Sequence, residues 1–256
     1  MWQEIIITDL TKMSGNKVCI AGITHKNVTI RPNMPAPGIL EKHLYQNGQV
    51  IIRPGSVLSM NLEPEEDCEP PHREDHHWLD FEQTSWLRTL DSEHWKDVLR
   101  RISYPRIRDI FDGNLRENKF HPPSAGSRSL GTNQAKSIEN FTYKLNRWGK
   151  WQYRLSFTDA AGELFEDIPI TDLALRCYAD NLQETQDLSS EQISEKLTLL
   201  FSGSQAWLRL GLTRPFDKNE KGEAWCYLQV NGIYTFPDYL EGKCFADFQN
   251  PTTYPF

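Results

Sequence analysis

The densest group of chemically capable side chains in this sequence is PPHREDHHWLD, residues 70–80, with three histidines and three carboxylates. His72 and His76 are four residues apart, and on a helix such a pair can hold one metal ion. The run HREDH lacks the glutamate that follows the first histidine in the H-E-x-x-H motif, and Pro70 and Pro71 only allow a helix to begin. We therefore predict no metal at this segment.

Glu74 and Asp75 are adjacent carboxylates that could do acid/base work, with His72 as a general base. Adjacent carboxylates are also common on protein surfaces, and adjacency alone defines no geometry. We favour a polar binding pocket in which His72, Glu74 and Asp75 supply hydrogen bonds, over a solvated loop without chemistry. His76 and His77 are interpreted as surface residues.

A second informative region runs from WLRLGLTRPF to WCYLQVNGIYTFPDYL, residues 207–240, and mixes cations with aromatic rings. OB-type barrels bind single strands and nucleotides with such mixtures, although most strand aromatics simply pack in cores. Arg214 precedes Pro215 at a predicted strand end, where an arginine must find a partner or water. Trp225 is a candidate stacking ring, and Asp238 could be a turn residue or a helix cap.

The elements that must position these residues are mostly short strands. The β-rich runs are residues 4–8, 17–23, 28–32, 56–62, 141–146, 151–159, 163–170, 206–212, 224–230 and 233–236. Residues 66–80 and 121–134 read as loops. Helices are predicted over 91–102, where Asp91 can cap the first turn, and over 189–203, where Ser189 and Gln192 form a capping box and Gly203 ends the helix.

Composition limits the function classes. The net charge of −7 argues against broad duplex binding, which depends on neutralising phosphates, but it permits a local basic groove that includes Arg31. Five dispersed cysteines without a CxxC pair argue against disulfides and zinc-cysteine sites. No run of 18 apolar residues and no signal-peptide pattern is present, so we expect a cytoplasmic protein without membrane association, and no cofactor.

Two blocks of short strands predict a mainly β chain with α insertions, built as two small OB-like β-barrels joined by a helix and loop segment. The expected divisions are a first barrel over 1–66, a connecting segment over 67–138, a second barrel with one helix over 139–242, and a tail over 243–256. Arginine-proline pairs recur in TIRPN, IIRPG and LTRPF, which places the arginines at strand ends near a barrel rim.

Four stretches carry a resemblance to a known family: KVCIAGITHKNVTIRPN, PHREDHHW, LRLGLTRPF and WCYLQVNGIYTFPDYL. In this order and spacing they resemble bacterial dual OB-containing domain proteins, although residues 85–140 do not match. The resemblance implies two OB-like barrels and a nucleic-acid or nucleotide-related role in defence or mobile-element gene neighbourhoods. One departure is Thr29, where an aromatic often precedes the Ile-Arg-Pro run. The residues that the resemblance marks as candidates are Arg31, Pro32, His72, Glu74, Asp75, Arg214, Pro215, Trp225, Asn231, Gly232, Pro237 and Asp238.

Three functions follow as hypotheses, and binding is favoured over catalysis. The first is a protein that binds single-stranded nucleic acid or a nucleotide. The second is a nucleic-acid-processing enzyme that uses His72 with Glu74 or Asp75. The third is a protein-interaction subunit with a partner from the same operon. The predicted ligand-binding residues are Arg31, His72, Glu74, Asp75, Arg214, Trp225, Asn231 and Asp238.

Overall fold

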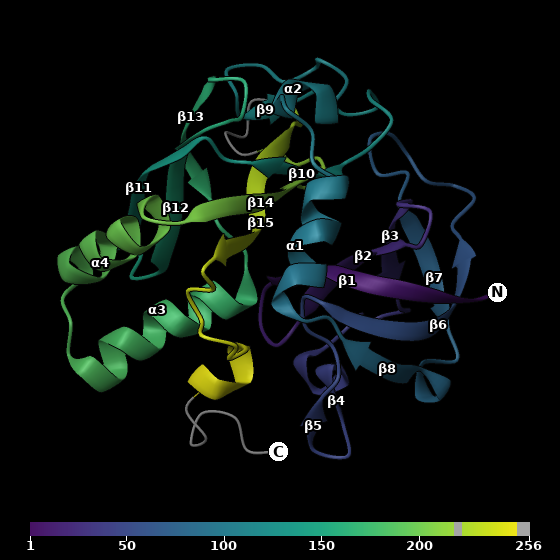
Figure 1. The fold of residues 1–256 in the computed structure, drawn as a ribbon. Helices are drawn as coiled ribbons and strands as arrows, with labels where there is room; N and C mark the ends of the chain where they lie inside the picture. The colour runs from purple at the N-terminus through teal and green to yellow at the C-terminus, as the bar shows by residue number, and fades with distance from the viewer. Residues whose placement is uncertain (218–221, 250–256) are drawn as a thin grey trace.

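The computed structural model describes residues 1–217 and 222–249. Two β-rich halves stand side by side, and helix α1 (Ser92–Arg101) lies over the boundary between them (Figure 1). Trp95 of α1 packs edge-on against Tyr234 of the second half, with ring centroids 5.0 Å apart. Arg101 of α1 donates to the side-chain oxygen of Asn27 in the first half at 2.9 Å. The helix therefore links both halves.

The first half is a closed five-stranded barrel in the order β1-β2-β3-β7-β6, closed by pairing of β6 with β1. All neighbours are antiparallel except β3 and β7, which are parallel. A further strand, β8, continues along β6 beyond the end of β7. The strands are β1 (Trp2–Lys12), β2 (Val18–Thr24), β3 (Thr29–Asn33), β6 (Ser56–Pro64), β7 (Asp75–Leu79) and β8 (Ser85–Thr89). A short insert between β3 and β6 holds η1 (Glu41–Leu44), β4 (Tyr45–Gln46) and β5 (Gln49–Val50).

The second half repeats this order with two sheets, β10-β14-β15-β9 and β11-β12-β13. The chain passes from β10 into β11, and a parallel bridge from Ile170 to Val230 joins the end of β13 to β15. The strands are β9 (Phe120–His121), β10 (Leu130–Gln134), β11 (Ser137–Leu145), β12 (Trp151–Thr158), β13 (Leu164–Pro169), β14 (Gln205–Leu212) and β15 (Cys226–Phe236). The prediction of a mainly β chain with two OB-like barrels is thereby confirmed.

Local sequence explains where the helices start. The Asp91 carboxylate accepts from the His94 amide at 2.9 Å at the start of α1, and Ser189 forms the predicted capping box of α4 (Ser190–Ser202). Helix α3 (Leu173–Gln186) was not expected. Its cap is Asp172, which accepts from the Ala174 and Leu175 amides and also from the Ile233 amide of β15. This carboxylate therefore fixes α3 to the second barrel.

Several predicted boundaries differ from the structure. Residues 75–79, interpreted as loop, form β7, because their backbone groups pair with β3 and β6, although three of their five side chains are polar. The first barrel therefore extends past residue 66. Strand β10 lies inside both the expected connecting segment and the predicted loop 121–134. The expected tail contains η3 (Phe245–Phe248), and residues 250–256 lie outside the described part.

The hydrophobic interior has two centres, one in each half, because alternate strand residues such as Ile5 and Ile7 point inward. The centre in the first barrel is completed by residues from far along the chain, namely Leu173 and Ala174 of α3 and Phe245 of η3. Within the described ranges, no helix combines the length and the apolar character that crossing a membrane requires.

Candidate functional site

A cleft of about 590 Å³ opens between the two barrels. The first barrel contributes the β1–β2 connection and the segment that starts in β3. The second barrel contributes the end of β14, the residues that follow it, and β15. Among the residues that line the cleft are Asp9, Lys12, Met13, Lys17, Arg31, Met34, Arg214, Phe216 and Asn231.

Asp75 joins arginines from both barrels beside this cleft. Its Oδ1 accepts from Nε of Arg31 in β3 at 2.5 Å, and its Oδ2 pairs with Arg214, which follows β14. Burial acts to raise the pKa of Asp75, but hydrogen bonds and positive charge from the two guanidiniums outweigh it and hold the pKa below its usual value. The Arg214 side chain is 56% exposed, so it is also available to a ligand.

Glu74 is used by the protein itself. Its carboxylate accepts from the Ser129 amide at 2.6 Å, the Ser129 hydroxyl at 3.0 Å and the Leu130 amide at 3.1 Å. Its backbone carbonyl accepts from the Arg31 amide at 2.7 Å. Burial raises the pKa of Glu74, against the effects of Arg31 and Ser129. Glu74 therefore braces Arg31 and the start of β10 rather than facing a ligand.

His72 is buried next to the arginines, with 2% of its surface exposed. Neither ring nitrogen has a hydrogen-bond partner of good geometry in the described part of the chain, although the backbone of Thr213 is near. Burial, together with the positive charges of Arg31 and Arg214, lowers the pKa of His72 to about 3. Such a weak base is poorly suited to general-base catalysis near pH 7, which disfavours the enzymatic hypothesis.

We expect the His72 ring to stay neutral in the folded protein from pH 7 down to about pH 4. The unfolded chain binds this proton near pH 6.5, so the stability that neutral His72 provides is lost as the pH falls below 6.5. Side-chain NMR titration checks the ring directly. The difference in unfolding free energy between the wild type and His72→Gln should shrink over the same pH range. A ring midpoint near 6.5 in the folded protein would contradict the prediction.

Two buried polar atoms of cleft residues have no partner within residues 1–217 and 222–249: Nη2 of Arg31 and Oδ1 of Asp9. Arg31 is 7% exposed and Asp9 is 1% exposed. A buried donor or acceptor left unsatisfied costs about 1–3 kcal/mol. Arg31 and Asp9 line the cleft, and one donor and one acceptor of theirs are unused by the described protein atoms.

The remaining predicted site residues lie in different parts of the structure. Asn231 lines the cleft, where its Oδ1 accepts from the Thr171 hydroxyl at 3.2 Å. Trp225 does not line it; its ring lies under the Arg116 guanidinium, 5.0 Å from the centroid. Asp238 lies at a separate cavity of about 240 Å³ and accepts from the Leu240 and Gly242 amides, which makes it a turn residue.

Sequence reasoning missed the β1–β2 connection as part of the site. The run DLTKMSGNK, which covers the end of β1 and this connection, places Asp9, Lys12 and Lys17 around the cleft, and Lys12 is also paired with Glu41. Two lysines on either side of a tight SGN turn were the available signal. The strand-end position of Phe216, directly after Arg214 and Pro215, was a second one.

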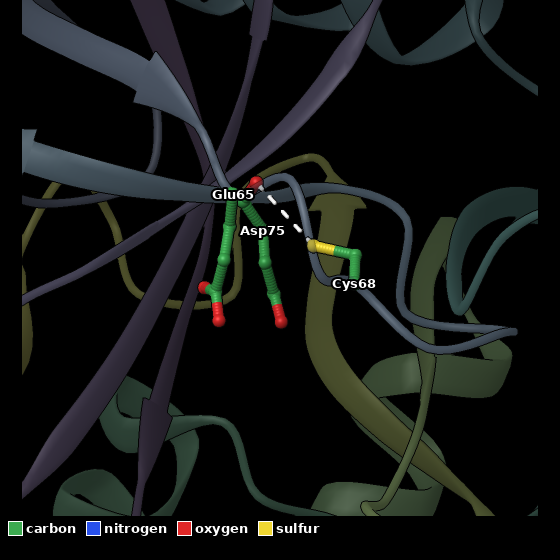
Figure 2. Close-up of side chains that lie close together, drawn as sticks. All are labelled: Glu65, Cys68 and Asp75. Atoms are coloured by element: carbon green, nitrogen blue, oxygen red, sulfur yellow. Dashed lines mark hydrogen bonds between the residues drawn. The ribbon is translucent and has the colours of Figure 1, made fainter.

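Glu65, Cys68 and Asp75 bring potential metal-ligand atoms within 4.8 Å of one another. Figure 2 shows the three side chains close together. The Cys68 thiol donates to the Asp75 carbonyl at 3.8 Å, and burial raises the pKa of this thiol, so thiolate formation is disfavoured. Both carboxylate oxygens of Asp75 are already engaged by Arg31 and Arg214. A divalent cation would have to displace or adjoin two guanidiniums, so the group does not fit a metal well.

The chain matches the model of the Dual OB-containing domain family over residues 4–233. The comparison with curated proteins finds no match. The matched range covers both barrels and every predicted site residue except Asp238. This agrees with the closed first barrel and with the repeated strand order of the second. The chain therefore belongs to the family of proteins with a dual OB-containing domain.

Proposed function

We propose that the cleft between the barrels binds a phosphate-bearing ligand of the nucleic-acid class, either a single strand or a nucleotide. The observation that carries the proposal is the unpartnered Nη2 of buried Arg31 beside the exposed Arg214 at one cleft. Guanidiniums suit phosphate because their planar donors can make two parallel hydrogen bonds.

The rest of the lining supports this ligand class. Lys17 adds positive charge to a cleft that lies within a protein of net charge −7, whereas the charge of Lys12 is paired with Glu41. Asn231 offers amide groups of the kind that read sugar hydroxyls or base edges. Phe216 is 45% exposed and lines the same cleft, where a base could contact its ring.

The position of the cleft in the fold also supports the proposal. It lies against the β1–β2 connection of the first barrel and against residues 213–216, which follow β14 in the second barrel. These correspond to the connections between strands one and two, and between strands four and five, of OB-type barrels. Such connections commonly hold oligonucleotides or oligosaccharides. The cationic lining favours the oligonucleotide. The expected cytoplasmic location, operon partner and defence or mobile-element setting rest on the sequence alone and stay predictions.

Fluorescence anisotropy at low salt, with single-stranded DNA, RNA and free nucleotides, tests the proposal. Arg214→Gln is expected to weaken binding about 13- to 160-fold, because a charge-assisted hydrogen bond contributes about 1.5–3 kcal/mol. Arg88→Gln is the control, since Arg88 is similarly exposed but pairs with Glu4 away from the cleft. Absence of binding by the wild type at low salt, where electrostatic attraction is strongest, would overturn the proposal.

A further inference from the structure

The hairpin between β11 and β12 concentrates positive charge in an acidic protein. Between Glu139 and Asp159 the sequence contains two lysines and two arginines and no carboxylate. Arg154 approaches the Asp167 carboxylate at 3.9 Å. Lys144, Arg147 and Lys150 form no salt bridge with any residue in the described ranges. Their charge is therefore free to attract an anionic partner.

The tip of this hairpin also presents an unusually exposed ring. Trp148 is 67% exposed, and the Arg147 guanidinium lies 4.1 Å from its ring centroid. Leu145, the last residue of β11, is 52% exposed. A tryptophan that leaves most of its ring in water forgoes the burial that normally stabilises such side chains. A stacking partner from outside the chain would recover that contact.

The tip is held in one shape before any partner arrives. The side-chain oxygen of Asn146 accepts from the Trp148 and Lys150 amides, both at 2.9 Å. Directly below, Trp151 stacks on Tyr143 in nearly parallel planes with centroids 4.3 Å apart. A preorganised ring loses less conformational freedom on binding than a ring on a mobile loop.

We infer that the β11–β12 hairpin is a second contact for single-stranded nucleic acid, in which Trp148 stacks on a base and Lys144, Arg147 and Lys150 contact phosphates. None of these residues is among those that line the cleft. The ligand class rests on the function proposed for the cleft, while the charge and the exposed ring are independent observations. The two contacts together select a strand that is longer than a nucleotide.

The test compares a long oligodeoxythymidylate of about 20 nucleotides with a short one of about 4, because one OB barrel covers roughly 4–16 nucleotides. Trp148→Ala is expected to weaken binding of the long strand about 5- to 150-fold, the loss of one stacked base. Trp148→Phe should retain most of the affinity. Binding of the short strand, which the cleft alone can hold, should not change. Replacing Lys144, Arg147 and Lys150 together with glutamine should reduce the slope of log K against log salt by about 2, since each contact contributes about 0.7.

Trp86→Ala is the matched control, because Trp86 is a 47% exposed tryptophan on β8 of the other barrel. The inference fails if Trp148→Ala and Trp86→Ala bind the long strand equally well. It also fails if anionic phosphatidylserine vesicles, and not the strand, bind in a Trp148-dependent manner. If the wild-type protein binds no strand at low salt, both proposals are wrong. A loss in Trp148→Ala with none in Arg214→Gln would remove the cleft proposal and keep the hairpin.

Discussion

Arg209→Met is expected to lower the free energy of unfolding by about 3–5 kcal/mol, the usual effect of removing one partner of a buried ion pair. Arg209 of β14 donates through Nε to Oδ2 of Asp9 in β1 at 2.8 Å, and through Nη1 to the Thr132 hydroxyl at 2.8 Å. Both charged side chains are at most 2% exposed. Without the guanidinium, the Asp9 carboxylate keeps only the Thr8 hydroxyl as a partner in a site closed to solvent. Urea-induced unfolding measures the loss.

A double-mutant cycle gives the control for this prediction. Asp9→Asn with Arg209→Met should recover much of the stability, because no uncompensated buried charge remains. Arg88→Met breaks an exposed pair with Glu4, whose atoms are 3.7 Å apart, and should cost less than about 1 kcal/mol. If the double variant loses as much unfolding free energy as the two single variants added together, Asp9 and Arg209 do not act as a pair.

Asp75→Asn is expected to lower the free energy of unfolding by a similar amount, about 3–5 kcal/mol at pH 7. The substitution leaves Arg31, whose side chain is 8% exposed, without its carboxylate partner, and it releases Arg214 of the other barrel. The amide that replaces the carboxylate keeps only one acceptor oxygen and carries no charge. Thermal unfolding followed by near-UV circular dichroism measures the change.

The pH dependence identifies the cause of this loss. The pKa of Asp75 is held below its usual 3.8, so its stabilising contribution is present above pH 3.8 and is lost as the pH falls through the folded-state pKa. The difference between the wild type and Asp75→Asn should therefore narrow in acid. Asp67→Asn, an exposed carboxylate in the preceding loop, should have no measurable effect at any pH. If the difference in unfolding free energy between the wild type and Asp75→Asn is unchanged at pH 2, the lost stability comes from altered packing and not from the lost charge.

Much of the fold could be predicted because its signals are local. The β-rich runs became β1, β2, β3 and β6, and the caps Asp91 and Ser189 begin their helices as expected. Strand β7 was missed because parallel pairing with β3 is a long-range event, and the polar run EDHH carries no strand pattern of its own. Helix α3 was missed because its cap, Asp172, is stabilised partly by the amide of Ile233, which is 61 residues away.

Which predicted site residues lie together can be compared with the structure, whereas their role in binding stays a prediction. Arg31, His72, Glu74, Asp75 and Arg214 do converge, although they come from both barrels. The residue types alone could not show that protein donors already hydrogen-bond the carboxylates of Glu74 and Asp75. Burial and hydrogen-bond partners depend on the packed fold. The pair of Asp9 and Arg209 left no sequence signal, because 200 residues separate the two members.

The interior of the first barrel also determines how the chain can be assembled. Its five strands end at residue 79, yet Leu173, Ala174 and Phe245 complete its apolar centre. During synthesis on a ribosome, the N-terminal strands emerge long before those residues do, and their apolar end stays uncovered in the meantime. A nascent chain released before Phe245 would present this surface to chaperones or to other nascent copies. Helix α3 and η3, both far along the chain, thus cover the apolar end of the first barrel.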